Sequence, residues 1–491
     1  METLPHRQDP DTSSPRETAA SVPLCVDLDG TLVKTNTLLE CVLRLVKTNP
    51  GTLWRLPLWL PRGQAYVWGK VGPLAGLDVG RLPLRAEVVE LIRAEGVAGR
   101  QIVLVTGAHQ AVAAPIAERV GGFHETLATS AGTHLVGARK AELLVGRFGA
   151  GGFDYAGDSS RDLPVWRQAR QAIVVNGSAG LIRKLRRSGV TVSVLAPKRT
   201  AGRALFGALR PHQWAKNLLV FIPLMLGHKL NRPGLLASAA EAFLATCVAG
   251  SGTYLINDLL DLEADRAHAV KRHRPLASGE LALGTGMAAG LALVMAALAI
   301  AGLAGGAVAA LVAVYLVLSS GYSLWWKRVL ALDVILLAGL YCLRLLIGSV
   351  ATNIPLSPWT VAFSMFLFLS LALMKRYSEL HNLKAGQREE TAAGRSYRVA
   401  DMPVVSGLGA ASSMTAVLVV ALYVNGNEVR TAYGHPDALW LICVFVLLWI
   451  TRLWLLAGRG ELDEDPVLFA LTDPWSLALG VLSGLAVLVA L

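Results

Sequence analysis

The chain has 491 residues, of which 53% are hydrophobic and 16% charged, and its formal net charge is +11. So apolar a composition excludes an ordinary soluble protein and predicts several transmembrane helices. The positive charge suits anionic lipid surfaces and phosphate-bearing substrates, and no nucleic-acid-binding motif accompanies it. The five cysteines are scattered without a CxxC pair, which argues against a zinc site and against a disulfide framework.

Composition divides the chain into three parts. Residues 1–20 are polar and lack the apolar core of a signal peptide, so we expect a disordered tail there. Residues 21–200 mix polar and apolar segments, as a soluble domain does. Residues 201–491 are mostly apolar and are expected to form a membrane domain.

Four short apolar segments predict strands in the soluble part. They cover residues 22–26, 101–105, 151–156 and 172–175, and helical segments lie between them. This alternation predicts an open parallel α/β sheet, in which ligands bind at the carboxyl ends of the strands. Polar motifs follow the first three strands, so we expect their side chains to meet at one edge of the sheet.

The motif after the first strand is DLDGTL, residues 27–32, and it carries two carboxylates that suit phosphoryl transfer. Asp27 can attack a phosphorus atom and form an aspartyl-phosphate. Asp29 can protonate the leaving oxygen and then activate water. The alternative interpretation is that both aspartates are simple turn residues.

Residues further along the chain can complete this chemistry. Thr106 can hydrogen-bond the phosphoryl group, and Lys140 can neutralise its developing charge, although Arg139 is an adjacent cation. Asp158 and Asp162, in the GDSxxD segment, can form a Mg²⁺ site together with Asp27.

These four motifs occur in one order across residues 22–177 and together resemble the haloacid-dehalogenase-like phosphohydrolases. The resemblance implies a Mg²⁺-dependent phosphatase, with a catalytically dead regulatory copy as the alternative. Residues 36–99 stand at the position of that family's cap and carry Leu and Trp residues among basic ones. They are expected either to lie on the membrane surface or to form a small helical cap. Residues 181–213 are basic and predict a linker along an anionic leaflet.

Nine apolar segments predict membrane spans, and their Gly and Ala content suits close helix packing. They cover residues 214–230, 235–256, 282–303, 305–321, 329–350, 357–374, 404–424, 436–456 and 473–491. Lys and Arg gather in the loops after the second, fourth and sixth spans. The positive-inside rule therefore places these loops and the amino-terminal domain in the cytosol, and the carboxyl terminus outside.

The loop after the second span begins with an acidic motif. On a helix, Asp258, Asp261 and Asp265 share one face, and three neighbouring carboxylates repel one another unless a divalent cation lies among them. We therefore expect a Mg²⁺ site there, giving one Mg²⁺ in each domain. The alternative is a solvated acidic helix end.

Basic and polar residues near the cytosolic loops suit phosphate groups. Lys216 can bind a phosphate near the interface or serve as a snorkelling anchor. Arg344 lies at membrane depth, where an ionisable group usually faces a functional cavity, and Asp333 is either its counter-ion or an interfacial residue. The remaining candidates for substrate binding are Asn217, Asn257, Lys271, Arg272, Arg274, Lys375, Arg376 and Tyr377.

Residues 205–491 resemble the UbiA superfamily of intramembrane prenyltransferases through the NDxxDxxxD motif, the nine spans and the basic segment after the motif. Its classical members carry a second Asp-rich motif in a later cytosolic loop, where this chain has KRYSEL, residues 375–380. With RPxQWxKN and NDxxDxEADRxHxxKRxRP, this segment resembles the subgroup that makes decaprenylphosphoryl-5-phosphoribose.

This resemblance implies a reaction between phosphoribosyl diphosphate and a polyprenyl phosphate in the cell (inner) membrane. Asp258, Asp261 and Asp265 would hold Mg²⁺ on the diphosphate, with Lys271, Arg272, Arg274, Lys375 and Arg376 around its other phosphates. Lys216 and Arg344 would fix the lipid phosphate, and Asn257 and Tyr377 would orient the donor. The front domain would then remove the 5-phosphate, giving polyprenyl-phosphoryl ribose, a precursor of lipid-linked pentose such as D-arabinofuranose.

Other functions stay open at the level of sequence. Within enzymes, the alternative is transfer of a prenyl group from a prenyl diphosphate to an aromatic acceptor, with the front domain acting separately or as a regulatory module. A transporter would carry acidic residues at the membrane midplane, whereas the carboxylates here are predicted at helix ends. The front domain could also only bind phosphate or act on an unrelated soluble phosphomonoester. The sequence does not determine the oligomeric state, and a homo-oligomer is one possibility.

Overall fold

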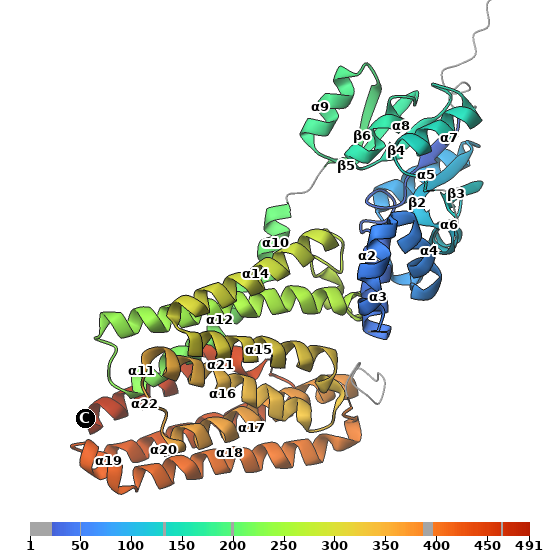
Figure 1. The fold of residues 1–491 in the computed structure, drawn as a ribbon. Helices are drawn as coiled ribbons and strands as arrows, with labels where there is room; N and C mark the ends of the chain where they lie inside the picture. The colour runs from blue at the N-terminus through green and yellow to red at the C-terminus, as the bar shows by residue number, and fades with distance from the viewer. Residues whose placement is uncertain (1–21, 50, 131–133, 198–200, 386–395, 463–464) are drawn as a thin grey trace, which may run out of the picture. The chain divides into compact units, whose positions relative to one another are not determined.

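The computed structural model describes residues 22–49, 51–130, 134–197, 201–385, 396–462 and 465–491, so the predicted tail lies outside the described residues. The chain forms two compact units (Figure 1). The first unit consists of residues 1–208 and 258–288, and the second of residues 209–257 and 289–491. The acidic motif that follows Asn257 therefore belongs to the first unit.

The first unit contains a six-stranded sheet in which all neighbouring strands are parallel. The strand order is β3-β2-β1-β4-β5-β6. The strands are β1 (Leu24–Val26), β2 (Ile102–His109), β3 (Glu125–Thr129), β4 (Asp154–Gly157), β5 (Gln171–Gly177) and β6 (Thr191–Pro197). The predicted parallel α/β sheet is confirmed, while β3 and β6, the two edge strands, were not predicted.

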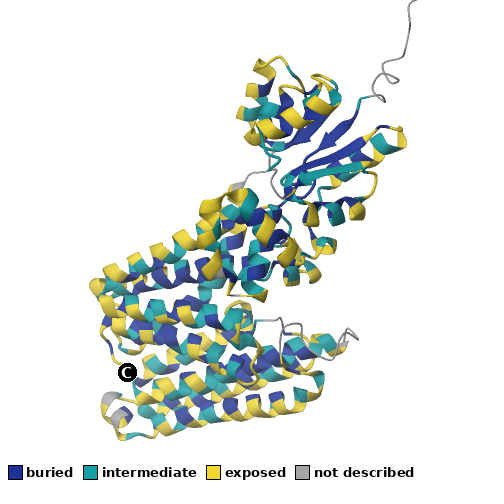
Figure 2. Ribbon diagram, turned by 45° about the vertical axis from the view of Figure 1, so that its right-hand side comes forward, coloured by how far each residue is buried: buried dark blue, intermediate teal, exposed yellow. Residues whose placement is uncertain are grey.

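Strand β1 lies at the centre because its three residues are apolar on both faces. Leu24 and Val26 pack into the core on one side of the sheet, and Cys25 packs into the core on the other side. The inner strands are mostly buried, the edge strands β3 and β6 are less so, and the surrounding helices expose their outer faces (Figure 2). This central position puts the residues after β1 at the middle of the sheet's carboxyl edge.

Helices surround the sheet and build the insert of residues 36–99. They are α2 (Thr37–Thr48), α3 (Thr52–Trp59), α4 (Gln64–Ala75), α5 (Ala86–Val97), α6 (Gln110–Val120), α7 (Ala138–Phe148), α8 (Leu163–Trp166) and α9 (Ala179–Arg187). In α4, Trp68 and Val71 are buried in the core of the unit, which agrees with a small helical cap. In α3, Trp54 is 84% exposed, so this helix still carries the apolar surface that suits a membrane interface.

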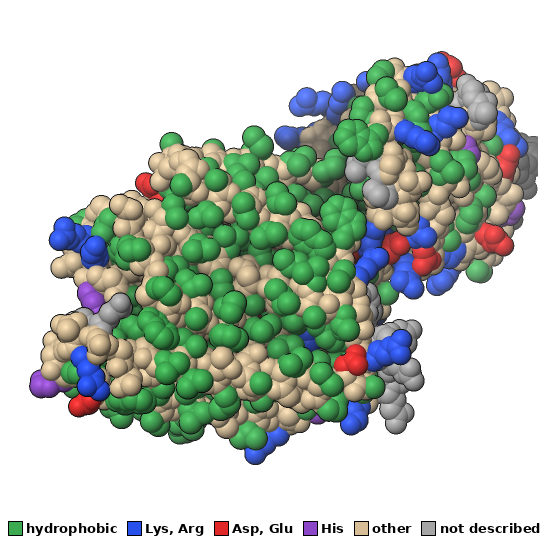
Figure 3. Space-filling view, turned by 60° about the horizontal axis from the view of Figure 1, so that its bottom comes forward, with side chains coloured by type: hydrophobic (Ala, Val, Ile, Leu, Met, Phe, Trp, Pro, Cys, Tyr) green, Lys and Arg blue, Asp and Glu red, His purple; other side chains and the backbone are tan. Residues whose placement is uncertain are grey.

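The second unit is helical and has the length and hydropathy of a membrane domain. Among the described residues, seven helices can cross a membrane, and a bent pair would make an eighth span. The seven are α12 (Pro233–Leu260), α14 (Leu283–Ala304), α15 (Gly306–Leu324), α16 (Leu332–Thr352), α17 (Pro358–Ala385), α18 (Met402–Val424) and α20 (Trp440–Gly458), and the bent pair is α21 (Pro466–Thr472) with α22 (Pro474–Ala490). Hydrophobic side chains spread across the outer face of these helices (Figure 3).

The segment predicted as the first of nine spans differs from the prediction. Residues 214–230 form most of a 3₁₀ helix, η4 (Pro211–Phe221), and a short α-helix, α11 (Ile222–Leu226). Pro223 near the start of α11 cannot donate a backbone hydrogen bond, and the two pieces are separately too short to cross a bilayer. The other eight predicted segments overlap the seven helices and the bent pair.

The 3₁₀ helix η4 packs closely against α16 at a glycine. A Cβ built at Gly348 would overlap the backbone oxygen of Val220, which is fully buried. Gly339, nine residues earlier in the same helix, has no neighbouring atom at its Cβ position. Gly348 is thus required for the close approach that holds η4, whereas Gly339 is not.

We predict that Gly348→Ala destabilises the helical unit, because the extra methyl group must push the η4 backbone away, at a cost of about 1–3 kcal/mol. Gly339→Ala removes backbone freedom from the unfolded chain without a clash and is expected to be neutral or stabilising. Thermal unfolding in detergent measures both variants. Equal midpoints for the two would contradict the packing described for Gly348.

Candidate functional sites

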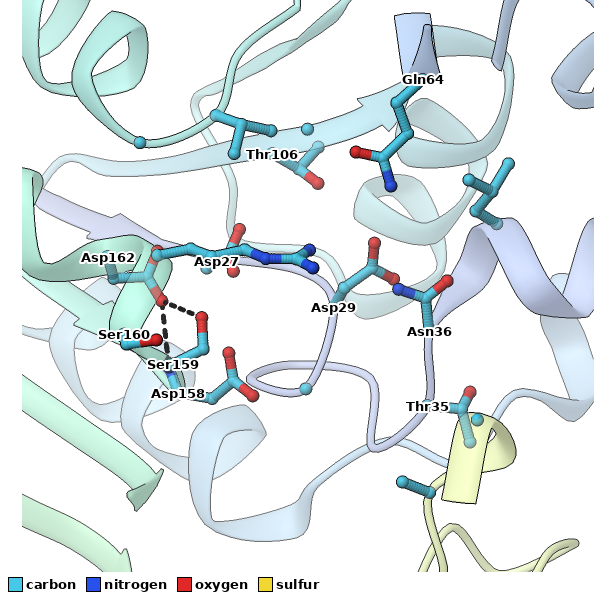
Figure 4. A pocket seen from close by; sticks show the side chains of 18 of the residues that line it. Asp27, Asp29, Thr35, Asn36, Gln64, Thr106, Asp158, Ser159, Ser160 and Asp162 are labelled. Carbon is cyan, nitrogen blue, oxygen red and sulfur yellow. Dashed lines mark hydrogen bonds between the residues drawn. The ribbon is translucent and has the colours of Figure 1, made fainter. Parts of the chain in front are cut away.

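The polar motifs of the first unit meet at the carboxyl edge of the sheet. Asp27 follows β1, Asp158 follows β4, and Asp162 ends the short 3₁₀ helix after it (Figure 4). One carboxylate oxygen from each of these three residues lies within 4.8 Å of the others. Among the described residues, these are the three acids grouped closely enough to share a cation. Gly30, with φ +80°, completes the turn, since a Cβ there would overlap the carboxylate of Asp158.

Lys140 is the cation of this site. It lies in the first turn of α7, with its Nζ 2.7 Å from Asp27 Oδ1 and 2.8 Å from the Tyr155 hydroxyl. Tyr155 in turn donates to Asp162 Oδ1 at 3.0 Å. Lys140 is buried whereas Arg139 is exposed, so the structure distinguishes the two cations that the sequence offered.

Tyr155 is a residue of this site that the sequence interpretation missed. It is fully buried in β4 and connects the cation to the third carboxylate. A buried tyrosine needs a partner for its hydroxyl, so a Tyr two residues before the strand's end and three before Asp158 was a usable signal.

Burial dominates the electrostatics of the acidic group. It raises the pKa of Asp27 to about 7, against the opposing charge of Lys140, and raises the pKa of Asp158 to about 8, with the Asp27 and Asp162 charges adding to the effect. Burial lowers the pKa of Lys140, but Asp27 and Asp162 outweigh this and the net shift is upward. Two buried carboxylates and the half-buried Asp158 face one lysine, so carboxylates outnumber cations and these oxygen donors fit Mg²⁺.

The other predicted residues of this motif set line the same cavity, which has a volume of about 410 Å³. Asp29 is oriented by the backbone N–H of Thr37, which donates to its Oδ1 at 2.7 Å. Thr106 accepts a hydrogen bond from the N–H of Ala108 at 3.0 Å. The cavity is also lined by Asn36 and Gln64 from the insert and by residues 282–284, which the sequence interpretation did not include.

The acidic motif of residues 258–265 does not lie on one continuous helix, which corrects the prediction. Helix α12 ends at Leu260, and Asp261, with φ −101°, stands before a new short helix, α13 (Leu262–Ala267). Arg274 Nη1 lies 3.1 Å from Asp258 Oδ1 and 2.7 Å from Asp265 Oδ2, so these two carboxylates converge on one cationic position. Asp261 instead accepts a hydrogen bond from Lys47 Nζ at 2.9 Å.

The chemistry of these three carboxylates fits Mg²⁺, which prefers oxygen ligands. In the described structure their oxygens are held by Arg274 and Lys47 instead, and the three are not grouped closely enough to share one cation as Asp27, Asp158 and Asp162 are. A Mg²⁺ site at residues 258–265 therefore stays a prediction. Of the basic residues predicted to surround the donor, Lys271 is half-buried and Arg272 is exposed. Asn257 is half-buried in the last turn of α12.

The second unit brings other predicted residues together. Lys216 on η4 is buried and forms an ion pair with Asp465, which precedes α21. Burial would raise the pKa of Asp465, but Lys216 and Lys375 outweigh it and lower that pKa. The sequence interpretation missed Asp465 because it lies 249 residues after Lys216. Its position just before a proline also resembled an ordinary loop.

Arg344 lies in a polar cluster inside this unit. Its Nε donates to Asn217 Oδ1 at 2.8 Å, and one of its terminal nitrogens donates to the Tyr315 hydroxyl at 3.1 Å. The guanidinium also lies over the rings of Tyr315 and Tyr341, at 5.0 and 5.3 Å. Two of the predicted substrate-binding residues, Arg344 and Asn217, therefore contact each other in this cluster.

Asp333 is not the counter-ion of Arg344, which corrects one of the two interpretations offered for it. Its Oδ2 lies 2.7 Å from Arg376 Nε, and Arg376 also pairs with Glu379 and donates to the Tyr322 hydroxyl at 3.0 Å. Arg376 is only 1% exposed. These contacts hold Arg376 within the internal structure of the unit, and its role in binding the donor stays a prediction.

Tyr377 also packs within the unit. Its ring lies edge-on to Trp454, with centroids 5.9 Å apart, and tilted against His381 at 6.2 Å. These aromatic contacts fix the ring, and its role in orienting the donor stays a prediction.

Comparison with known proteins agrees with this membrane architecture. Residues 220–477 match the model of the UbiA prenyltransferase family. The chain belongs to this family. A UbiA homologue from Archaeoglobus fulgidus bound to GPP and Mg²⁺ shares 16% identity with it, covering 58% of this chain and 98% of that one at a TM-score of 0.45.

Two curated relatives differ in how much of the chain they match. The uncharacterized protein y4nM of Sinorhizobium fredii is 37% identical over 473 residues, which cover 96% of this chain and 91% of the relative. The decaprenyl-phosphate phosphoribosyltransferase of Corynebacterium glutamicum is 39% identical over 191 residues, which cover 38% of this chain and 57% of the relative. The chain is thus an integral membrane protein with transferase relatives.

We predict that Lys140→Gln lowers the stability of the metal-free protein by about 1–3 kcal/mol, because Asp27 and Tyr155 lose a buried partner. Arg139→Gln removes the same charge from an exposed neighbour and is expected to change stability by less than about 0.5 kcal/mol. Thermal unfolding in EDTA compares the two. A larger loss in Arg139→Gln would contradict the position given to Lys140.

Proposed function

We propose that the chain is a bifunctional membrane enzyme that makes polyprenyl-phosphoryl ribose. Its membrane unit would transfer 5-phosphoribosyl from phosphoribosyl diphosphate to a polyprenyl phosphate. Its front domain, of the haloacid-dehalogenase-like type, would remove the 5-phosphate. The product is a precursor for lipid-linked pentose donors, and the domain division proposed is 21–200 and 201–491.

For the transfer step, the support is the 39% identity to a decaprenyl-phosphate phosphoribosyltransferase together with the grouping of basic residues. In the reaction, the bond from ribose C1 to the diphosphate breaks and a bond from C1 to a lipid phosphate oxygen forms. Mg²⁺ bound by Asp258 and Asp265, with Asp261, would supply charge neutralisation for the leaving diphosphate. No side-chain nucleophile is required.

Cations of the membrane unit suit the acceptor. Buried Lys216 pairs with Asp465, and the half-buried Lys375 interacts electrostatically with both Asp465 and Glu379. Their ammonium groups would exchange these carboxylates for the phosphate of the lipid. Arg344 and Asn217 extend this polar region. The positive-inside pattern supports an inner-membrane orientation in which the acidic motif faces the cytosol.

For the phosphatase step, the support is the buried geometry of Asp27 and its neighbours. Asp27 attacks the phosphorus atom of the 5-phosphate, the bond from phosphorus to the ribose oxygen breaks, and Asp29 gives that oxygen a proton. Water then attacks the aspartyl-phosphate, Asp29 takes a proton from the water, and orthophosphate leaves. Lys140 and Thr106 hold the phosphoryl oxygens, and Mg²⁺ at Asp27, Asp158 and Asp162 would offset their charge.

One observation carries the coupling of the two steps. Residues 282–284 line the phosphatase cavity, and Leu283 is the first residue of α14, a 22-residue candidate membrane span. A membrane span begins at the level of the lipid headgroups. A phosphomonoester attached to a membrane lipid could therefore enter a cavity that is lined by the first turn of α14. A soluble phosphomonoester is the second candidate substrate, favoured by the polar lining from Gln64 and Asn36.

We predict that Asp258→Asn lowers ribosyl transfer by about 10²-fold or more, since it removes a ligand of the cation that stabilises the leaving diphosphate. Glu241→Gln, an exposed acid on the same helix, is the matched control and should keep full activity. Lipid products formed from phosphoribosyl diphosphate and polyprenyl phosphate are measured by mass spectrometry. Retained activity of Asp258→Asn at saturating Mg²⁺ would remove the metal-site assignment, and activity only with a prenyl diphosphate would establish the alternative reaction.

We predict that Asp27→Asn leaves transfer intact but makes the 5-phosphorylated lipid accumulate, because the phosphatase loses its nucleophile. Glu118→Gln, an exposed acid of the same domain, should behave as wild type. Wild-type protein should release orthophosphate and form polyprenyl-phosphoryl ribose. Wild type and both variants could instead form the same lipid product, while wild type still hydrolyses a soluble aryl phosphate. That result would mean that the phosphatase acts on a different substrate.

A further inference from the structure

Helix α2 reaches two functional regions of the first unit. At its start, the backbone N–H of Thr37 donates to Asp29 Oδ1 at 2.7 Å, and the preceding Asn36 lines the phosphatase cavity. Asn36 also caps the helix, since its side chain accepts a hydrogen bond from the N–H of Leu39. The beginning of α2 is therefore part of the wall that orients the acid–base residue.

The remainder of α2 presents three charged residues to the acidic motif. Glu40, Arg44 and Lys47 are spaced i, i+4 and i+7, which places them on one face of the helix. Their partners are Arg266, Glu263 and Asp261, so the two segments pair in opposite chain directions. The signs are complementary at all three positions, and a shift of register would bring like charges together.

The first of these pairs is the anchor. Arg266 donates to both oxygens of Glu40, at 2.6 and 3.1 Å, and both side chains are almost completely buried. Thr35 donates to Glu40 at 2.8 Å, and Arg266 also donates to the backbone oxygen of Ala277 at 3.0 Å. A bidentate, buried pair of this kind fixes geometry, because separating it would leave two uncompensated charges.

The third pair lies at the carboxylate expected to bind metal. Lys47 Nζ donates to Asp261 Oδ1 at 2.9 Å and to the backbone oxygen of Leu260 at 3.1 Å. Leu260 is the last residue of α12, so the lysine also caps the end of that helix. An ammonium group at this position occupies one of the two Asp261 oxygens, and its positive charge opposes a second cation at the same carboxylate.

We propose that α2 is a coupling helix, in which Lys47 and the metal–diphosphate compete for Asp261. This inference rests on the proposed role of residues 258–265 in binding the donor. With the donor absent, Lys47 holds Asp261 and α2 is docked along its whole length. Metal binding at Asp261 releases Lys47 and loosens the far end of α2, while the Glu40–Arg266 pair keeps the helix attached. The transfer site thereby reports its occupancy to the helix that lines the phosphatase cavity.

Metal binding to the full-length protein in detergent tests the competition, with Mn²⁺ as the probe and electron paramagnetic resonance as the readout. The protein carries Asp27→Asn and Asp158→Asn, which remove ligands of the other acidic group. In this background, Lys47→Met is expected to tighten Mn²⁺ binding by about threefold or more, since it removes a competing positive charge. Lys70→Met removes the same charge from an exposed position of the same insert and should change the affinity by less than about twofold.

The outcomes separate the two levels of the proposal. Binding that does not depend on Asp258, tested with Asp258→Asn, overturns both the metal site and the competition. Binding that depends on Asp258 but is equal in Lys47→Met and wild type overturns the competition alone.

Amide hydrogen exchange of residues 37–48 gives a second measurement, made in the same Asp27→Asn and Asp158→Asn background. The docked helix is expected to exchange faster when Mn²⁺ is added, with the increase concentrated toward Lys47. The charge reversals Glu40→Arg and Arg266→Glu should each increase exchange across the helix, and their combination should restore protection. Unchanged exchange on adding saturating Mn²⁺ would overturn the coupling.

Discussion

A buried carboxylate is stable only beside a positive group, and this constraint shapes both units of the chain. Asp27 has Lys140, Asp258 and Asp265 share Arg274, Asp333 has Arg376, and Asp465 has Lys216. Where the charged groups are enclosed by the helices, as in the cluster of Asp333, Arg376 and Glu379, they hold helices together. Where carboxylates outnumber cations beside a cavity, as around Asp27, the site suits a cation.

The fold puts these sites at the ends of regular elements for simple reasons. Parallel strands bring their carboxyl ends to one edge, so the acids after β1 and β4 converge without needing to be near in sequence. Membrane helices must end where the bilayer ends, so the acids after α12 and the first residues of α14 fall at a boundary between apolar and polar surroundings. The first residues of α14 also line the cavity of the front domain. In our proposal, this lets the phosphatase site reach a substrate that is attached to a lipid.

Much of the front domain could be predicted because its functional residues are short-range motifs at strand ends. Asp27, Asp29, Asp158 and Asp162 follow their strands directly, and the structure brings them around one cavity. Tyr155 was missed because a tyrosine inside an apolar strand is usually a core residue, and only its position three residues before Asp158 indicated a polar partner. The edge strands β3 and β6 were missed because partly polar sequences such as Glu125–Thr129 lack the continuous apolar run of a central strand.

The membrane half was predictable in its helices and less so in its ion pairs. Hydropathy identifies spans well, but it cannot show that η4 is a 3₁₀ helix or that Asp261 interrupts a helix. Partners such as Lys216 and Asp465 are almost 250 residues apart, and only packing brings them together. For the same reason, Arg376 could be recognised as a basic residue but not as a member of a buried network.

In the proposed function, one polypeptide carries out ribosyl transfer and then dephosphorylation. A time course of diphosphate, orthophosphate and lipid products, with purified wild-type protein, phosphoribosyl diphosphate, polyprenyl phosphate and Mg²⁺, tests this sequence of reactions. We expect diphosphate to appear first, orthophosphate to follow in an equal final amount, and the lipid to carry an unphosphorylated ribose. Diphosphate released without any pentose on the lipid, or a ribosyl lipid that keeps its 5-phosphate indefinitely, would contradict it.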